Sequence, residues 1–156
     1  MIAVNIDIRI DDLTDPRIAL LLEEHLADMR RISPPESVHA LDLERLRNPG
    51  IKFWSAWAKD ELVGCGALKR LDGEHAEIKS MRTSNAYRRK GIGKLILEHI
   101  IGEARRDGYR RLSLETGTPP FFEPARTMYR SYGFEECAPF ADYRIDPYSV
   151  CMTRLL

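Results

Sequence analysis

Apolar and polar residues alternate along several segments of the chain with the period of two that is typical of a β-strand. The first such segment covers residues 4–10. Two apolar runs, 51–58 and 62–69, are separated only by a short polar turn, so they predict a hairpin. After the turn at Asp72-Gly73, a run at 76–83 continues the pattern. We therefore expect the last three of these strands to pair antiparallel in succession.

Three other segments place their apolar residues at helical spacing, as an amphipathic helix does. The first begins at Asp15-Pro16, a favourable N-cap followed by a proline in the first turn. The second covers 91–107 and is followed by Gly108. The third opens at Pro124 and ends at Gly133. The apolar face of the first helix is formed by Ile18, Leu21, Leu22, His25, Leu26 and Met29.

The remaining segments complete a mixed α/β pattern. Residues 112–116 predict a buried strand, while 134–140 and 149–156 predict a closing hairpin. The stretch 33–50 is irregular and predicts a loop followed by a short amphipathic turn through Leu41, Leu43 and Leu46. Because no repeat or flexible linker interrupts this pattern, we expect a single domain over 1–156.

Composition narrows the class of protein. The chain has 156 residues, 24 basic and 24 acidic, and 44% of its residues are hydrophobic, which suits one self-sufficient domain. Its cysteines, Cys65, Cys137 and Cys151, lack metal-ligand spacing, so we expect no metal and a reducing, cytoplasmic location. Cys65 is expected to pack as a small hydrophobic residue. No apolar run approaches the ~20 residues of a membrane-spanning helix, so no membrane association is expected.

Positive charge is concentrated in one segment. Residues 82–111 contain nine basic and three acidic side chains. Because the whole chain is neutral, this local excess indicates a compact anionic ligand more than a nucleic acid. A solvated helix face is the alternative interpretation.

A glycine-containing turn lies inside this basic segment, between a predicted strand and a predicted helix. Gly91 and Gly93 would let an anion approach the main chain, where the first N–H groups of the helix have no internal partner. The turn matches neither the dinucleotide-binding pattern nor the Walker pattern. It is surrounded by Arg88, Arg89, Lys90 and Lys94.

Two motifs resemble those of one family. The string Arg88-Arg-Lys-Gly91-Ile-Gly93 is similar to the Arg/Gln-x-x-Gly-x-Gly/Ala signature of the GNAT superfamily of N-acetyltransferases. The string Ala125-Arg-Thr-Met-Tyr129-Arg-Ser-Tyr-Gly133-Phe134 resembles the family's Ala-x-x-x-Tyr-x-x-x-Gly-Phe helix. The resemblance implies an α/β fold with a central mixed, mostly antiparallel sheet of about six to seven strands and about four helices. Asn85 and Phe122 depart from it, since many members have Pro and Asn at these positions.

The resemblance also implies a site for acetyl-CoA as cosubstrate. Pantetheine would lie between two splayed strands, and the Met81 N–H would polarise the thioester carbonyl. Phe121 is expected to pack on the pantetheine arm or to contact the acceptor substrate. The residues expected to bind acetyl-CoA are Met81, Arg82, Thr83, Arg88, Arg89, Lys90, Gly91, Ile92, Gly93 and Lys94.

Acetyl transfer to an amine needs a proton acceptor and a proton donor. Tyr129 occupies the family's tyrosine position and is the expected acid for the departing thiolate, with core packing as the alternative. Glu77 lies at the spacing at which a subset of the family carries a glutamate base. Its alternative interpretation is an exposed carboxylate beside Lys79. Glu115 is the competing base or the site that binds the substrate ammonium, and Asp142 and Glu36 are weaker candidates.

These features favour an enzyme that acetylates a primary amine of a small molecule by direct attack in a ternary complex. A protein or peptide N-acetyltransferase, a non-catalytic acyl-CoA-binding module and a nucleic-acid-binding domain are the alternatives, in falling order. Phe53, Trp54 and Trp57 could line the acceptor pocket, although strand aromatics are more often core. The resemblance is compatible with a homodimer, which no feature of the composition indicates.

Overall fold

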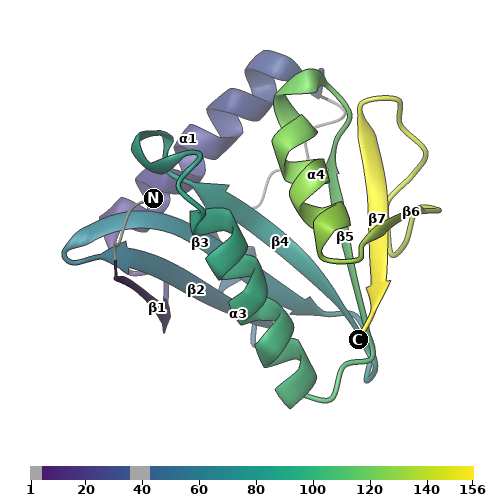
Figure 1. The fold of residues 1–156 in the computed structure, drawn as a ribbon, viewed down its shortest axis with the longest axis horizontal. Coiled ribbons are helices and arrows are strands. Elements are labelled where there is room, and N and C mark those ends of the chain that lie inside the picture. Colours follow the sequence, from purple (N-terminus) through teal and green to yellow (C-terminus); the bar gives the residue numbers. More distant parts are fainter. Residues whose placement is uncertain (1–4, 36–42) are drawn as a thin grey trace.

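The computed structural model describes residues 5–35 and 43–156, and these form a seven-stranded sheet with helices on both faces (Figure 1). The strand order is β1-β2-β3-β4-β5-β7-β6, and only the β4–β5 pair is parallel. This confirms the predicted fold class. The strands are β1 (Ile6–Ile10), β2 (Ile51–Ala58), β3 (Glu61–Arg70), β4 (His75–Thr83), β5 (Arg111–Gly117), β6 (Glu135–Cys137) and β7 (Ser149–Leu155).

The helices divide between the two faces of the sheet. Helices α3 (Ile92–Arg106) and α4 (Glu123–Ser131) lie on the near face in Figure 1, and α1 (Pro16–Ile32) lies behind the sheet. The short α2 (Leu43–Leu46) follows α1, and the 3-10 turns are η2 (Asn85–Tyr87) and η3 (Pro120–Phe122). As expected, the Asp15 carboxylate caps α1 by accepting a hydrogen bond from the Arg17 N–H at 2.9 Å.

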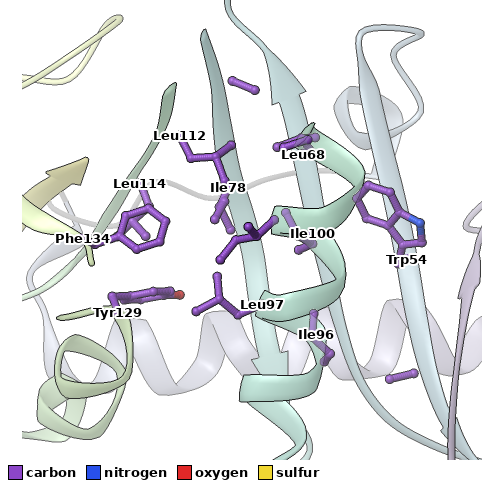
Figure 2. Packing of buried hydrophobic residues seen from close by; sticks show 14 of the residues in the cluster. Trp54, Leu68, Ile78, Ile96, Leu97, Ile100, Leu112, Leu114, Tyr129 and Phe134 are labelled. Carbon is purple, nitrogen blue, oxygen red and sulfur yellow. The ribbon is translucent and has the colours of Figure 1, made fainter. Parts of the chain in front are cut away.

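The core beneath α3 is formed by aliphatic side chains from this helix and from β3, β4 and β5 (Figure 2). The helix approaches β3 closely because β3 has glycine beneath it. A Cβ atom on Gly66 would lie 2.8 Å from the Ile100 Cδ1, which is too close for a real contact. Trp54 belongs to this core. Phe53 packs with the α1 residues, and Trp57 is also buried. These aromatic side chains therefore belong to the core, and none of them lines the cavity between α1, β4, β5 and α4.

Two expected segments differ from the structure in extent. The penultimate strand, expected over 134–140, covers only Glu135–Cys137, and the chain then leaves the sheet edge. Pro139 lies in the departing segment and has no N–H to donate to the ladder. Part of the expected turn after α1 lies outside the described residues, including Glu36 and Leu41.

Strand β4 changes course in its second half. Residues Lys79 and Arg82 pair with Ala67 and Cys65, so two β4 residues oppose the single residue Gly66, and Ser80 has a φ of 55°. This is a β-bulge, which bends a strand and redirects its N–H groups. The β4–β5 pairing runs only from His75↔Arg111 to Glu77↔Ser113. Beyond it the two strands diverge (Figure 1), as the resemblance implied.

Candidate active site

Three cavities surround the place where β4 and β5 part. The helix-end cleft, of about 560 Å³, is lined by the end of β4, the start of α3, η3 and α4. The inner cavity, of about 140 Å³, lies between α1, β4, β5 and α4. The outer cavity, of about 480 Å³, extends toward the β2 and β3 ends and the 141–143 segment. The helix-end cleft and the inner cavity adjoin, because both are lined by His25, Met81, Phe122, Ala125 and Tyr129.

The helix-end cleft is shaped for an anion. Gly91 is the N-cap of α3 with a φ of 82°, and no atom lies within 4 Å of the Cβ position it lacks. The first residues of α3 line the cleft, so the positive end of the helix, with its unpaired N–H groups, borders this space. Arg88, Arg89, Gly93 and Lys94 also line the cleft. Main chain and charge together fit a diphosphate.

Two of the predicted cofactor residues make contacts beyond the main chain. The Arg88 guanidinium stacks over the Phe121 ring at 5.0 Å and lies 3.1 Å from the Asp28 carboxylate on α1. The Lys90 ammonium lies 5.0 Å from the Tyr87 ring centroid. Phe121 thus lies at the helix-end cleft with Arg88 and does not line the inner cavity.

Arg82 is used mainly for structure. Its guanidinium is buried and lies 2.7 Å from both Glu24 and Asp28, which fastens the end of β4 to α1. Burial of Asp28 opposes its ionisation, but hydrogen bonds and positive charge from Arg82 and Arg31 outweigh this and lower the pKa of Asp28. Arg82 still lines the cleft, but its side chain is committed to this ion pair.

Glu77 lines the inner cavity and is only 2% exposed. Its Oε2 accepts hydrogen bonds from the Tyr143 hydroxyl at 2.5 Å and from the Lys79 Nζ at 3.1 Å. Lys79 also donates to the Tyr143 hydroxyl at 3.0 Å. The interpretation of Glu77 as an exposed carboxylate is therefore wrong, since it is buried in a closed hydrogen-bond triangle.

Glu115 lines the same cavity from β5. Burial raises its pKa to about 7, and a Ser149 hydrogen bond and the charge of Lys79 only partly oppose this. Near neutral pH this carboxyl is therefore partly protonated, whereas a surface glutamate of ordinary pKa is fully ionised.

Tyr129 lies on α4 where the helix-end cleft meets the inner cavity. It is 5% exposed, and its ring packs edge-on against Phe134 with a centroid distance of 5.8 Å (Figure 2). Burial alone raises the pKa of its phenol above the usual value, so it holds its proton at neutral pH. The ring belongs to the core while the residue also lines both cavities, so core packing and a chemical role coexist.

The comparisons with known proteins agree with this geometry. Residues 18–134 match the model of the Acetyltransferase (GNAT) family. The chain belongs to the GNAT acetyltransferase family. It is 61% identical over 149 residues to the uncharacterized N-acetyltransferase YsnE of Bacillus subtilis (strain 168), and the alignment covers 96% of this chain and 99% of YsnE. It is 35% identical over 154 residues to the IAA acetyltransferase of Azospirillum brasilense, covering 97% and 99% of the two chains.

Solved structures give the same fold. The putative acyl-CoA N-acyltransferase from Klebsiella pneumoniae superposes with a TM-score of 0.82 at 26% identity, over 97% of each chain. A GNAT family acetyltransferase from Elizabethkingia anophelis, whose structure has acetyl-CoA bound, gives a TM-score of 0.71 at 22% identity, over 97% of this chain and 99% of that one. The protein is thus an acetyl-CoA-dependent N-acetyltransferase of the GNAT fold.

The departures from the GNAT motifs have local explanations. Phe122 stands where many members have Asn, and its ring lies over Gly117, where a Cβ would come within 2.2 Å of the ring. The aromatic ring therefore fixes η3 against β5 by packing. Asn85 accepts a hydrogen bond from the Arg82 Nη2 at 3.1 Å, which a proline could not do.

Two residues of the site were not identified from the GNAT motifs. Tyr143 comes from the irregular segment before β7, and nothing in its neighbourhood marks it as a partner of Glu77. For His25 the sequence left two interpretations, a core or boundary histidine and a residue that reaches a substrate pocket, and the structure places it in the lining of both the helix-end cleft and the inner cavity. Burial and the nearby Arg82 charge lower its pKa to about 4, so it is neutral at physiological pH.

Other candidate groups lie apart from this chemistry. Cys65 is fully buried, and burial raises the pKa of its thiol to about 12, which makes it an inert core residue as expected. Asp142 lines the outer cavity. Within residues 5–35 and 43–156, no group of three or more His, Cys, Asp or Glu side chains is arranged to hold a metal ion. Over the same ranges, no helix is long and apolar enough to cross a membrane.

Proposed function

We propose that this enzyme transfers the acetyl group of acetyl-CoA to the primary amine of a small molecule by direct attack within a ternary complex. The observation that carries the proposal is the inner cavity, where two carboxylic side chains and Tyr129 line a space of about 140 Å³ next to the helix-end cleft. Bound acetyl-CoA supplies the thioester. A cavity of this size suits a slender amine better than a folded protein surface.

The main chain does most of the proposed cofactor binding. The N–H groups at the start of α3 and the absence of side chains at Gly91 and Gly93 receive the diphosphate. Arg88, Arg89, Lys90 and Lys94 add positive charge. The bulge at Ser80 leaves Met81 at the opening between β4 and β5, where its N–H polarises the thioester carbonyl. Substitution of these side chains should therefore matter less than substitution of the glycines.

A substrate amine with a pKa near ~10 enters largely protonated, so a base must remove its proton. Both carboxylic side chains line the cavity, but their surroundings differ. Glu77 already accepts hydrogen bonds from the Tyr143 hydroxyl and the Lys79 ammonium at its Oε2. Glu115 has a pKa raised to about 7 and is the better matched proton acceptor. In this proposal Glu115 binds the ammonium and takes its proton, while Glu77 positions Lys79 and Tyr143.

Tyr129 is the proton donor in this proposal. The leaving thiolate has a conjugate acid near ~8.5, and a phenol kept protonated by burial can donate to it. Its place at the junction of the two cavities suits a group that meets the thioester sulfur from the cofactor side.

The first experiment is thermal unfolding with and without acetyl-CoA, using ATP and NAD as controls. At ~100 times its dissociation constant, a ligand adds about 2.7 kcal/mol to stability. We expect a shift with acetyl-CoA that ATP and NAD do not reproduce, followed by thiol release with an amine panel. Equal shifts with all three nucleotides would contradict a specific acetyl-CoA site.

A further inference from the structure

The outer cavity adjoins the inner cavity, in which the amine of the acceptor is proposed to bind. It shares Glu77, Lys79 and Tyr143 with the inner cavity, so the two adjoin through the hydrogen-bond triangle. Its remaining lining comes from the end of α2, the start of β2, the end of β3 and the 141–142 segment. A molecule whose amine lies beside Glu115 can therefore extend past Tyr143 into a space of about 480 Å³.

The charges along this path change sign. Glu115 lines the inner cavity, whereas the outer cavity is lined by the basic residues Arg45, Lys69 and Arg70. Lys69 is the residue opposite Glu77 in the β3–β4 ladder, which puts both on one face of the sheet. Glu77 and Lys79 form an ion pair with each other, so they add little net charge. Apart from Glu77, Asp142 is the acidic side chain among the described lining residues of the outer cavity. It offsets part of the positive charge of the basic residues there.

We infer that the acetyl acceptor carries an anionic group in addition to its amine, and that Lys69 binds this group in the outer cavity. The inference rests on the proposed function, because it takes the inner cavity as the place of the amine. The class of acceptor is a zwitterion, with its ammonium at Glu115 and a carboxylate, phosphonate or phosphate at the basic end. Because the inner cavity has a carboxylic side chain and the adjoining outer cavity has basic ones, the two together select such a molecule over an uncharged amine derivative of the same length.

Matched acceptor pairs test this directly. The first panel is glycine, β-alanine, 4-aminobutyrate and 6-aminohexanoate, each compared with its own carboxamide, with thiol release as the readout of kcat/KM. We expect the carboxylates to be preferred by about tenfold or more, the effect of one charge-assisted contact, at a chain length that spans the two cavities. Aminoalkyl phosphonates of the same lengths distinguish a site for a phosphorus anion from one for a carboxylate.

The variant Lys69→Gln should reduce the preference for the anionic acceptor toward unity and leave kcat/KM for the carboxamides nearly unchanged. Asp142→Asn should change the preference in the opposite direction, because it removes the negative charge from the basic end. Arg105→Gln, at an exposed position near the end of α3, is the matched charge control and should have no effect.

The outcomes separate this inference from the proposed function. Equal rates for each acid and its amide, or a preference unchanged in Lys69→Gln, would overturn the anionic acceptor while amine acetylation stands. Acetyl-CoA binding without acetylation of any amine in either half of the panel would overturn the proposed acceptor class itself. A raised KM for acetyl-CoA in Lys69→Gln would also overturn the assignment, because the outer cavity would then serve the cofactor.

Discussion

The helix-end cleft and the inner cavity of the same enzyme are built in different ways. The cleft uses glycines and main-chain N–H groups from one short stretch, the start of α3, with basic side chains beside it. The inner cavity uses side chains from α1, β4, β5, α4 and the segment before β7. A main-chain site needs only backbone shape and tolerates varied side chains. A side-chain site depends on each residue, and this is where substrate choice resides.

The largest expected effect is the loss of acetyl-CoA binding in the helix-end cleft. Gly91→Glu would place a carboxylate beside the expected diphosphate, so we expect acetyl-CoA affinity to fall by at least about 1000-fold, since charge repulsion and steric exclusion act together. Isothermal titration with acetyl-CoA measures this.

Gly108→Glu is the matched control for that experiment. Gly91 and Gly108 have φ angles of 82° and 85°, and neither has an atom within 4 Å of its missing Cβ. The two substitutions should therefore cost similar stability, while only the first removes binding. Binding retained in Gly91→Glu would show that the diphosphate lies elsewhere.

The next largest effect is expected at the junction of the two regions. Tyr129→Phe should lower kcat by about 100- to 1000-fold and leave the Kd of acetyl-CoA unchanged, because a general acid acts on the leaving group and not on binding. Tyr132→Phe is the control, since the Tyr132 hydroxyl donates to Glu98, away from the cavities. An unchanged kcat in Tyr129→Phe would leave the residue with its packing role alone.

The pH dependence of kcat/KM tests whether Glu115 is the base. In the wild type, kcat/KM should rise with pH through an apparent pKa near 7, that of Glu115. Glu115→Gln should lose this limb and lower kcat/KM by about 100-fold, the smaller end of general-base effects because Glu77 remains nearby. Glu77→Gln is the comparison variant, and a missing pH limb in that variant alone would assign the base to Glu77.

Stability gives a second readout of Glu115 that does not depend on activity. Its pKa is raised on folding, so the folded state holds the proton longer than the unfolded state does. Its favourable contribution is complete below the unfolded pKa near ~4.3 and is lost as pH rises through about 7. Urea denaturation at pH 5 and pH 8 should therefore show a smaller fall in stability for Glu115→Gln than for the wild type. An equal fall would mean that Glu115 is not desolvated.

The sequence predicted the cleft better than the cavities for the same physical reason. Gly91, Gly93 and the basic residues are neighbours in the chain, and the strand and helix around them have clear periodicity, so the motif is readable locally. Tyr143 meets Glu77 across 66 positions of sequence, and only the folded chain brings them together. The exposure of Glu77 was misjudged because alternation along one strand does not reveal that a later segment covers that face.

The smallest expected effect concerns Asp28, which connects the helix-end cleft to α1. Asp28 on α1 lies 2.7 Å from Arg82 and 3.1 Å from Arg88, so it holds the end of β4 and also restrains a cation of the cleft. Asp28 is buried, but Arg88 is 41% exposed and therefore screened by solvent, so this pair is worth about the 0.2–1 kcal/mol of a surface pair. Asp28→Asn would release Arg88 toward the diphosphate, so we expect acetyl-CoA to bind up to about fivefold more tightly at low salt.

The same substitution should lower stability, because Arg82 is buried and would keep only Glu24 as its ionised partner. Affinity and stability would then move in opposite directions, which a general loosening of α1 would not produce. Asp7→Asn, which breaks the exposed Asp7–Arg9 pair on β1, is the control and should change neither quantity. Weaker acetyl-CoA binding in Asp28→Asn would mean that Asp28 positions Arg88 for the cofactor instead of competing with it.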